Sequence, residues 1–144
     1  MFRAILVPID IAHASSWRRV LPEAVELARA GRGTLTVMTV VRDIKAMFEG
    51  VYLSFQLEQM IEDARADLAR IVSEVPHNGV EVKQEVRFGS IRHEILAAAR
   101  AGTADLIVMA SHRPEAMDYL IGPNAAHVAQ HAPCSVLVLR KFDG

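Results

Sequence analysis

The sequence predicts a doubly wound α/β fold: a five-stranded parallel sheet in the order 3-2-1-4-5, with helices on both faces. Two observations lead to this fold class. Short apolar runs alternate along the chain with segments of helical periodicity. Most of these runs are apolar throughout, as in strands that are covered on both faces. Strands separated by helical crossovers form parallel sheets through right-handed connections.

Five segments have the composition of strands. Four of them are nearly continuous apolar or β-branched runs, which is typical of buried strands. The segment 80–88 instead alternates apolar and polar residues, which predicts a strand with one wet face at a sheet edge. The predicted strands span 4–9, 34–41, 80–88, 105–111 and 135–140.

The first helical segment follows the first strand, within 15–33. Its apolar positions fall on one helical stripe, and Gly31 or Gly33 is expected to end it. Pro22 indicates either a helix that starts late, with this residue in its first turn, or a kinked helix. The stripe consists of Trp17, Val20, Leu21, Ala24 and Ala28.

The clearest helix prediction covers about Ser54 to Val75, where apolar residues recur at steps of three and four. Two shorter helices are expected, one capped by Ser90 and one ended by Pro133. Residues 42–53 show no period and are predicted to form a long loop. With 144 residues, the chain has the size of one domain, which we place at 1–144.

Composition excludes several classes of function. A net charge of −1 gives no basic face for nucleic acid. No apolar run approaches the roughly 18 residues that a membrane span requires. The first residues lack the longer apolar region and the small-residue cleavage site expected of a secretory signal, and the single Cys134 cannot form an internal disulfide. We therefore expect a cytoplasmic protein in a reducing compartment.

The strand order makes the first and fourth strands neighbours. In open α/β sheets, ligands bind outside the carboxyl ends of the strands, where the order reverses. The residues that follow these two strands, 8–10 and 110–113, are therefore expected to line one crevice. Neither a phosphate-binding P-loop nor a G-x-G-x-x-G fingerprint is present.

The turn Gly122-Pro123-Asn124 leads into a predicted helix start. Backbone N–H groups at such a start can bind an anion, and Arg113 could add donors to a phosphate. An ordinary turn and a solvated arginine are the alternatives. Asp10 could accept hydrogen bonds from ribose hydroxyls or hold a cation, and its alternative role is to cap a turn.

A hydrolase based on Ser111 and His112 is the least favoured hypothesis. Adjacent residues at a strand end point to opposite sides, and no nucleophile elbow surrounds the serine. His127 and His131 lie four residues apart, but no carboxylate or cysteine pattern completes a zinc site, Cys134 aside. We expect these two histidines, like His13, His77 and His93, to face water.

Four segments carry a family resemblance: "ILVPID", "TVMTVV", "VRFGSIRHEIL" and "ADLIVMASHRPEAMDYLIGPNAAHVAQHAPCSVLVLR". Through them the whole chain resembles the universal stress protein family, in its Ala-Ser-His-Arg-Pro branch. The loop 42–53 is the part least alike. The resemblance implies the Rossmann-like fold of the adenine nucleotide alpha hydrolases.

Many members of this family bind ATP through Gly-x2-Gly-x9-Gly-Ser/Thr, and this chain departs from that pattern. Ala110 and Arg113 stand at the first two glycines, and Pro123 stands at the Ser/Thr. Pro123 removes a backbone donor and a hydroxyl, a loss of about 1–3 kcal/mol of binding. Arg113, in place of a glycine, would supply a side-chain cation that can bind phosphate.

Carried over residue by residue, the resemblance implies a nucleotide site. Asp10 would contact the ribose, with Mg²⁺ as a companion of the triphosphate and Asp10 as a candidate metal ligand. Val40 would pair its backbone with adenine. The remaining implied residues shape the pocket (Pro8, Ile9), lie beneath the nucleotide (Met109, Ala110) or surround the phosphates (His112, Arg113, Gly122, Asn124, Ala125).

The implied function is a regulatory ATP-binding protein in stress response, with little or no hydrolysis and an unknown regulatory partner. The alternative is a dimeric interaction protein that does not bind nucleotide. The apolar last strand, Ser135–Arg140, would pair with its copy in a homodimer. The alternative there is an edge shielded by the tail, 141–144.

Overall fold

The computed structural model describes residues 1–42, 52–111 and 124–140. Several sequence predictions fall outside these ranges. They are the body of the loop 42–53, the tail 141–144, and the residues His112, Arg113, Gly122 and Pro123.

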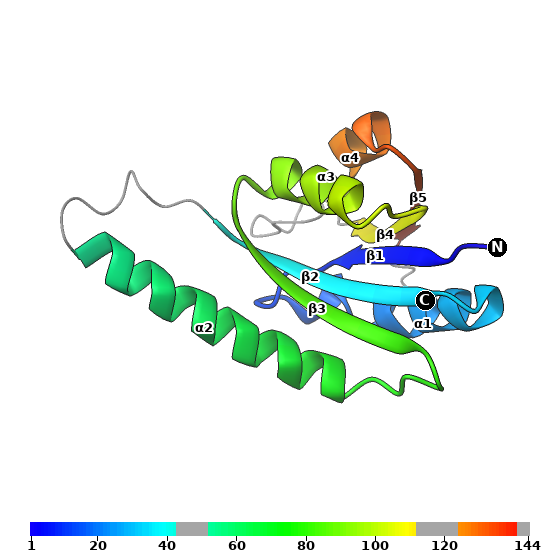
Figure 1. Ribbon diagram of the computed structural model, residues 1–144, viewed down its shortest axis with the longest axis horizontal. Coiled ribbons are helices and arrows are strands. Elements are labelled where there is room, and N and C mark those ends of the chain that lie inside the picture. Colours follow the sequence, from blue (N-terminus) through cyan, green and yellow to red (C-terminus); the bar gives the residue numbers. More distant parts are fainter. Residues whose placement is uncertain (43–51, 112–123, 141–144) are drawn as a thin grey trace.

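The sheet has the predicted topology. Five parallel strands are arranged in the order β3-β2-β1-β4-β5, so β3 lies at an edge as its alternating pattern predicted (Figure 1). Every boundary falls within one residue of the prediction. The strands are β1 (Ala4–Pro8), β2 (Thr34–Arg42), β3 (Glu81–Gly89), β4 (Leu106–Ser111) and β5 (Ser135–Arg140).

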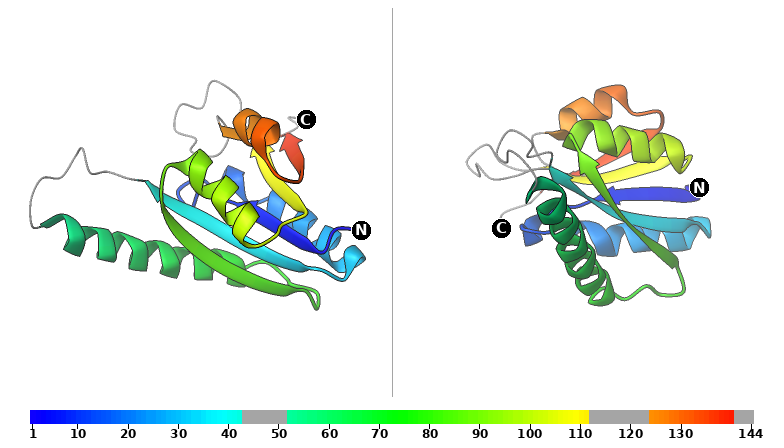
Figure 2. Two further views of the ribbon diagram at one scale, coloured as in Figure 1. Left: turned by 45° about the horizontal axis from the view of Figure 1, so that its top comes forward. Right: turned by 60° about the vertical axis from the view of Figure 1, so that its left-hand side comes forward.

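Helices cover both faces of the sheet. Figure 2 shows α1 and α2 on one side and α3 and α4 on the other. Two apolar clusters match these layers, one with α1 and α2 and the other with α3 and α4. The helices are α1 (Val20–Gly31), α2 (Tyr52–Ser73), α3 (Ile91–Ala101) and α4 (Ala125–His131), preceded by a 3₁₀ turn, η1 (Ala14–Ser16).

The first helix starts late, which settles the alternative that Pro22 left open. Pro22 is the third residue of α1, so its missing N–H falls in the turn where helical N–H groups have no internal partner. Trp17 lies before the helix, at the end of η1, and is half-buried. The prediction that it shares the helical stripe was therefore wrong, because Trp17 ends the separate 3₁₀ turn and α1 begins only at Val20.

An ion-pair cluster joins β3 to the start of α3. Arg87 donates from Nε to Glu94 at 2.9 Å and from Nη1 to Glu85 at 2.6 Å. These two bonds raise the pKa of Arg87 above its ordinary value. Ser90 lies at the N-cap of α3, but among the described residues its side chain makes no capping bond. Its carbonyl instead accepts the N–H of Glu94.

Candidate functional site

The switch point of the sheet lies between β1 and β4. The β1–β2 register runs from Ala4 to Pro8, the whole of β1. The β1–β4 register joins only Ile5 to Leu106 and Leu6 to Ile107, at the amino end of both strands. The carboxyl ends of β1 and β4 are thus the place where an open α/β sheet binds its ligand.

Asp10 lies just beyond β1 at this end, and it is buried. Its Oδ1 accepts the N–H of Ala12 at 3.0 Å, and its Oδ2 lies 2.8 Å from Nδ1 of His13. The turn-capping role that the sequence left open is therefore present in the structure. This capping role orients the carboxylate.

Buried hydroxyls hold the backbone that carries Asp10. Ser16 Oγ accepts the N–H of Asp10 at 2.9 Å, and it lies within 2.9 Å of the carbonyl oxygens of Asp10 and His13. Thr39 in β2 donates to the carbonyl of Ile9 at 2.9 Å. Ile9 in turn donates its N–H to Met38. The end of β1 is thus fixed from two sides.

Sequence reasoning did not single out these supporting residues. His13 and Ser16 follow Asp10 at steps of three, which was the available signal. Thr39 is a polar residue within the apolar run of β2, and it is 3 % exposed. A polar side chain inside a buried strand requires a hydrogen-bond partner, so Thr39 could have been identified as structural or functional.

The sequence-predicted apolar residues divide between the two faces of the sheet. Val40, Met109 and Ala125 belong to the cluster beneath α3 and α4. Ile9 and Ala110 belong to the cluster beneath α1 and α2. Pro8, the last residue of β1, is paired with Met38 of β2. All of these residues are buried, so the described part of the site has a packed apolar floor.

Asn124 is the N-cap residue of α4 and is 9 % exposed. Its Oδ1 accepts a hydrogen bond from Nε of Arg92, in the first turn of α3, at 2.7 Å. This bond joins segments 32 residues apart and brings a guanidinium beside one of the predicted site residues. Arg92 was not among the sequence-predicted residues, and a single arginine after a helix cap gave no specific signal.

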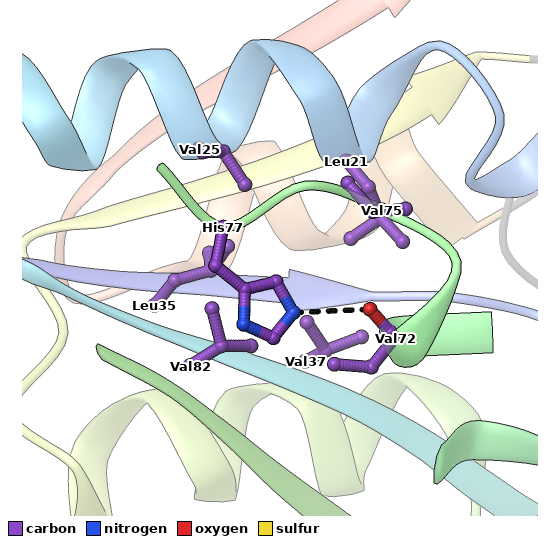
Figure 3. Close-up of a pocket in the computed structure, with 8 residues that line it drawn as sticks. All are labelled: Leu21, Val25, Leu35, Val37, Val72, Val75, His77 and Val82. Carbon is purple, nitrogen blue, oxygen red and sulfur yellow. Dashed lines mark hydrogen bonds between the residues drawn. The ribbon is translucent and has the colours of Figure 1, made fainter. Parts of the chain in front are cut away.

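A separate apolar pocket lies on the face of the sheet that α1 and α2 cover, between these helices, β2 and β3 (Figure 3). His77 is the polar residue in its lining, and its Nε2 lies 3.0 Å from the carbonyl of Val72. The pocket contains none of the sequence-predicted site residues. Its lining is Leu21, Val25, Leu35, Val37, Val72, Val75, His77 and Val82.

Within the three described ranges, no group of three or more His, Cys, Asp or Glu side chains could hold a metal ion. His127 and His131 form a tilted pair with ring centroids 4.4 Å apart. His93 and His131 are exposed, as expected. The expectation that the histidines face water is not met by His13, His77 and His127, which are half-buried. In the same ranges, no helix is long and apolar enough to cross a membrane.

The parallel sheet, with its order β3-β2-β1-β4-β5 and helices on both faces, defines a small, doubly wound α/β protein, a class in which ligands bind at the topological switch point. The model of the universal stress protein family matches residues 1–140 of this chain. The chain therefore belongs to the universal stress protein family.

Individual relatives agree with this membership. Universal stress protein G of Shigella flexneri is 29 % identical over 151 residues, covering 97 % of this chain and 100 % of that protein. Among solved structures, universal stress protein UspA from Lactobacillus plantarum superposes with a TM-score of 0.69 at 26 % identity, covering 96 % of this chain and 97 % of the other.

Two further structures share the fold at lower identity. A universal stress protein in complex with cAMP has a TM-score of 0.72 at 17 % identity, over 96 % of this chain and 97 % of its own. A family member from Arabidopsis thaliana with AMP bound has a TM-score of 0.65 at 15 % identity, over 97 % and 92 %. Members of this fold therefore include proteins that bind adenine nucleotides.

Proposed function

We propose that this protein is a regulatory adenine-nucleotide-binding protein that acts in stress response. ATP, with Mg²⁺, binds in the crevice between β1 and β4 and is hydrolysed slowly or not at all. The protein acts as a single cytoplasmic domain, 1–144. A regulatory protein partner responds to whether nucleotide is bound to it.

The observation that carries this proposal is the buried carboxylate of Asp10 at the switch point. A carboxylate held by a backbone N–H and an imidazole is fixed in position, and it can accept hydrogen bonds from ribose hydroxyls. Val40, Met109 and Ala125 provide apolar surface on one side of the same end of the sheet. Such a combination of apolar floor and few fixed polar groups is typical of a small-molecule site.

The remaining residues of the proposed site complete the nucleotide contacts. Pro8 and Ile9 shape the pocket, Ala110 lies beneath the nucleotide, and Asn124 lies beside the phosphates. The phosphate contacts assigned to His112, Arg113 and Gly122 lie outside the described residues, as does Pro123. Adenine-nucleotide complexes of two proteins with this fold support the proposal by analogy.

Calorimetric titration of the nucleotide-stripped protein with ATP and Mg²⁺, AMP and adenosine tests the proposal. We expect saturable binding that Asp10→Asn weakens, because an amide nitrogen cannot accept the ribose hydrogen bond. Asp105→Asn is a matched control. Like Asp10, Asp105 is hydrogen-bonded to the backbone, since it accepts the N–H groups of Arg3 and Ala4, but it does so at the amino end of β1. No binding by the folded wild type overturns the proposal.

A second candidate is a dimeric interaction protein of the same fold that does not bind nucleotide. One observation favours it: Leu137 of the edge strand β5 is 36 % exposed, which is high for a leucine on a strand. A second copy of the chain could cover this edge through β5. The two candidates differ in the titration above, since only the first requires heat of binding.

A further inference from the structure

The contact between Arg92 and Asn124 has a consequence for the ligand. Asn is among the preferred N-cap residues because its side-chain oxygen accepts a helical N–H. Asn124 lies at that position in α4, yet among the described residues its side chain makes no capping bond. Its Oδ1 accepts from Arg92 Nε at 2.7 Å instead. The oxygen is thus used to hold a cation.

This contact changes which groups the start of α4 presents to an anion. A bare carbonyl oxygen beside a phosphate would repel it, since both groups are acceptors. With the oxygen bonded to Arg92, that repulsion is offset by a guanidinium within one hydrogen bond of Asn124. Arg92 uses one of its five N–H donors in this contact. Its side chain is otherwise exposed, so a ligand can reach it.

The charge of Arg92 also acts on a histidine of α4. The pKa of His127, in the first turn of α4, lies below its ordinary value because of partial burial, the neighbouring His131 and the positive charge of Arg92. The hydrogen bond to Asn124, the N-cap residue, places the guanidinium beside the start of α4. Ala125, another proposed site residue, lies in the same turn.

Resting on the proposed nucleotide site, we infer that Arg92 is a specificity-determining residue for the phosphate chain. Its guanidinium, held by Asn124, donates to phosphate oxygens, so affinity rises from adenosine to AMP to ATP. Guanidinium and phosphate form strong, charge-assisted hydrogen bonds with matching geometry.

The test compares Arg92→Ala, Arg92→Lys and wild type in titrations with adenosine, AMP and ATP with Mg²⁺. Arg92→Ala is expected to weaken ATP binding about tenfold to a hundredfold and to leave adenosine binding unchanged. Arg92→Lys retains the charge but not the planar fork, so it should fall between the two. Arg100→Ala, in the last turn of the same helix, is the matched control and should bind like wild type.

The outcomes separate this inference from the proposed function. Wild-type binding with equal ATP affinity in Arg92→Ala overturns the inference and leaves the proposed function intact. Equal losses for adenosine and ATP also overturn it, because a phosphate contact cannot affect the nucleoside. Absence of binding by the wild type overturns both. Thermal unfolding of each variant verifies that it is folded at the titration temperature.

Discussion

The carboxylate of Asp10 and the imidazole of His13 form a pair, with Oδ2 and Nδ1 2.8 Å apart across a single turn. The Asp10 side chain is 2 % exposed and the His13 side chain 31 %, so the pair reaches from the interior to the surface. A buried carboxylate is costly unless it is hydrogen-bonded. His13 therefore stabilises the position that the proposed ribose contact requires.

The first prediction concerns this pair. His13→Ala removes the imidazole partner of the buried carboxylate and should lower the free energy of unfolding by about 1 kcal/mol. His93→Ala provides the control, because His93 is an exposed histidine on α3. Urea denaturation monitored by circular dichroism measures both. Equal midpoints for the two variants would show that the pair contributes nothing to stability.

The second prediction concerns the titration of His127. Since Arg92 is one cause of the lowered pKa, Arg92→Ala should raise the pKa of His127 toward its ordinary value of 6.5. The folded protein binds this proton less readily than the unfolded chain, so His127 costs stability as the pH falls through about 6.5. That loss should shrink in the variant.

An NMR titration of the histidine resonances measures this shift directly. ATP bound beside Arg92 should also raise the pKa of His127, because phosphate charge opposes the guanidinium. Arg100→Ala again provides the control and should leave the resonance unchanged. If the pKa of His127 is the same with and without Arg92, the guanidinium does not influence α4 in solution.

The third prediction concerns Gly89, the last residue of β3. Its φ is +140°, and an added Cβ would lie 3.1 Å from Oε2 of Glu94. Gly89→Ala should therefore lower the free energy of unfolding by about 1–3 kcal/mol through backbone strain. Gly102→Ala is a suitable control, since φ there is −87°. Chemical denaturation of both variants distinguishes strain from general loss of a glycine.

Much of the fold could be predicted because two periodicities differ clearly along the chain. Apolar runs predicted the buried strands, and the alternation of apolar and polar residues in 80–88 predicted the edge strand β3. The helix ends were less accurate. The segment predicted at Ser54–Val75 is α2, Tyr52–Ser73, because helix ends depend on capping contacts rather than on the apolar stripe.

The candidate site could be predicted only in part. Asp10 was identifiable because a polar residue follows a buried strand at the switch point. Its partners were not, since the contacts of Thr39 with Ile9 and of Arg92 with Asn124 join segments 30 and 32 residues apart. Such pairs form only when distant segments come together in the folded chain, so a single sequence does not show that their members are close in space.

The last prediction concerns the edge strand β5. Its exposed leucine, Leu137, should contact a second copy of the chain, so the purified protein should sediment as a dimer. Leu137→Asp places a charge in that contact, and it should shift the population to monomers. Met60→Asp is the matched control: Met60 is also 36 % exposed, but it lies on α2.

Sedimentation equilibrium over a range of protein concentrations separates the outcomes. A dimeric wild type, a monomeric Leu137→Asp variant and a dimeric Met60→Asp variant would place the contact at β5. The guanidinium of Arg19 already donates to the carbonyl of Arg140 at 2.7 Å, so this end of the edge is partly occupied within the chain. Pairing should therefore centre on the middle of β5. A monomeric wild type would exclude the dimer.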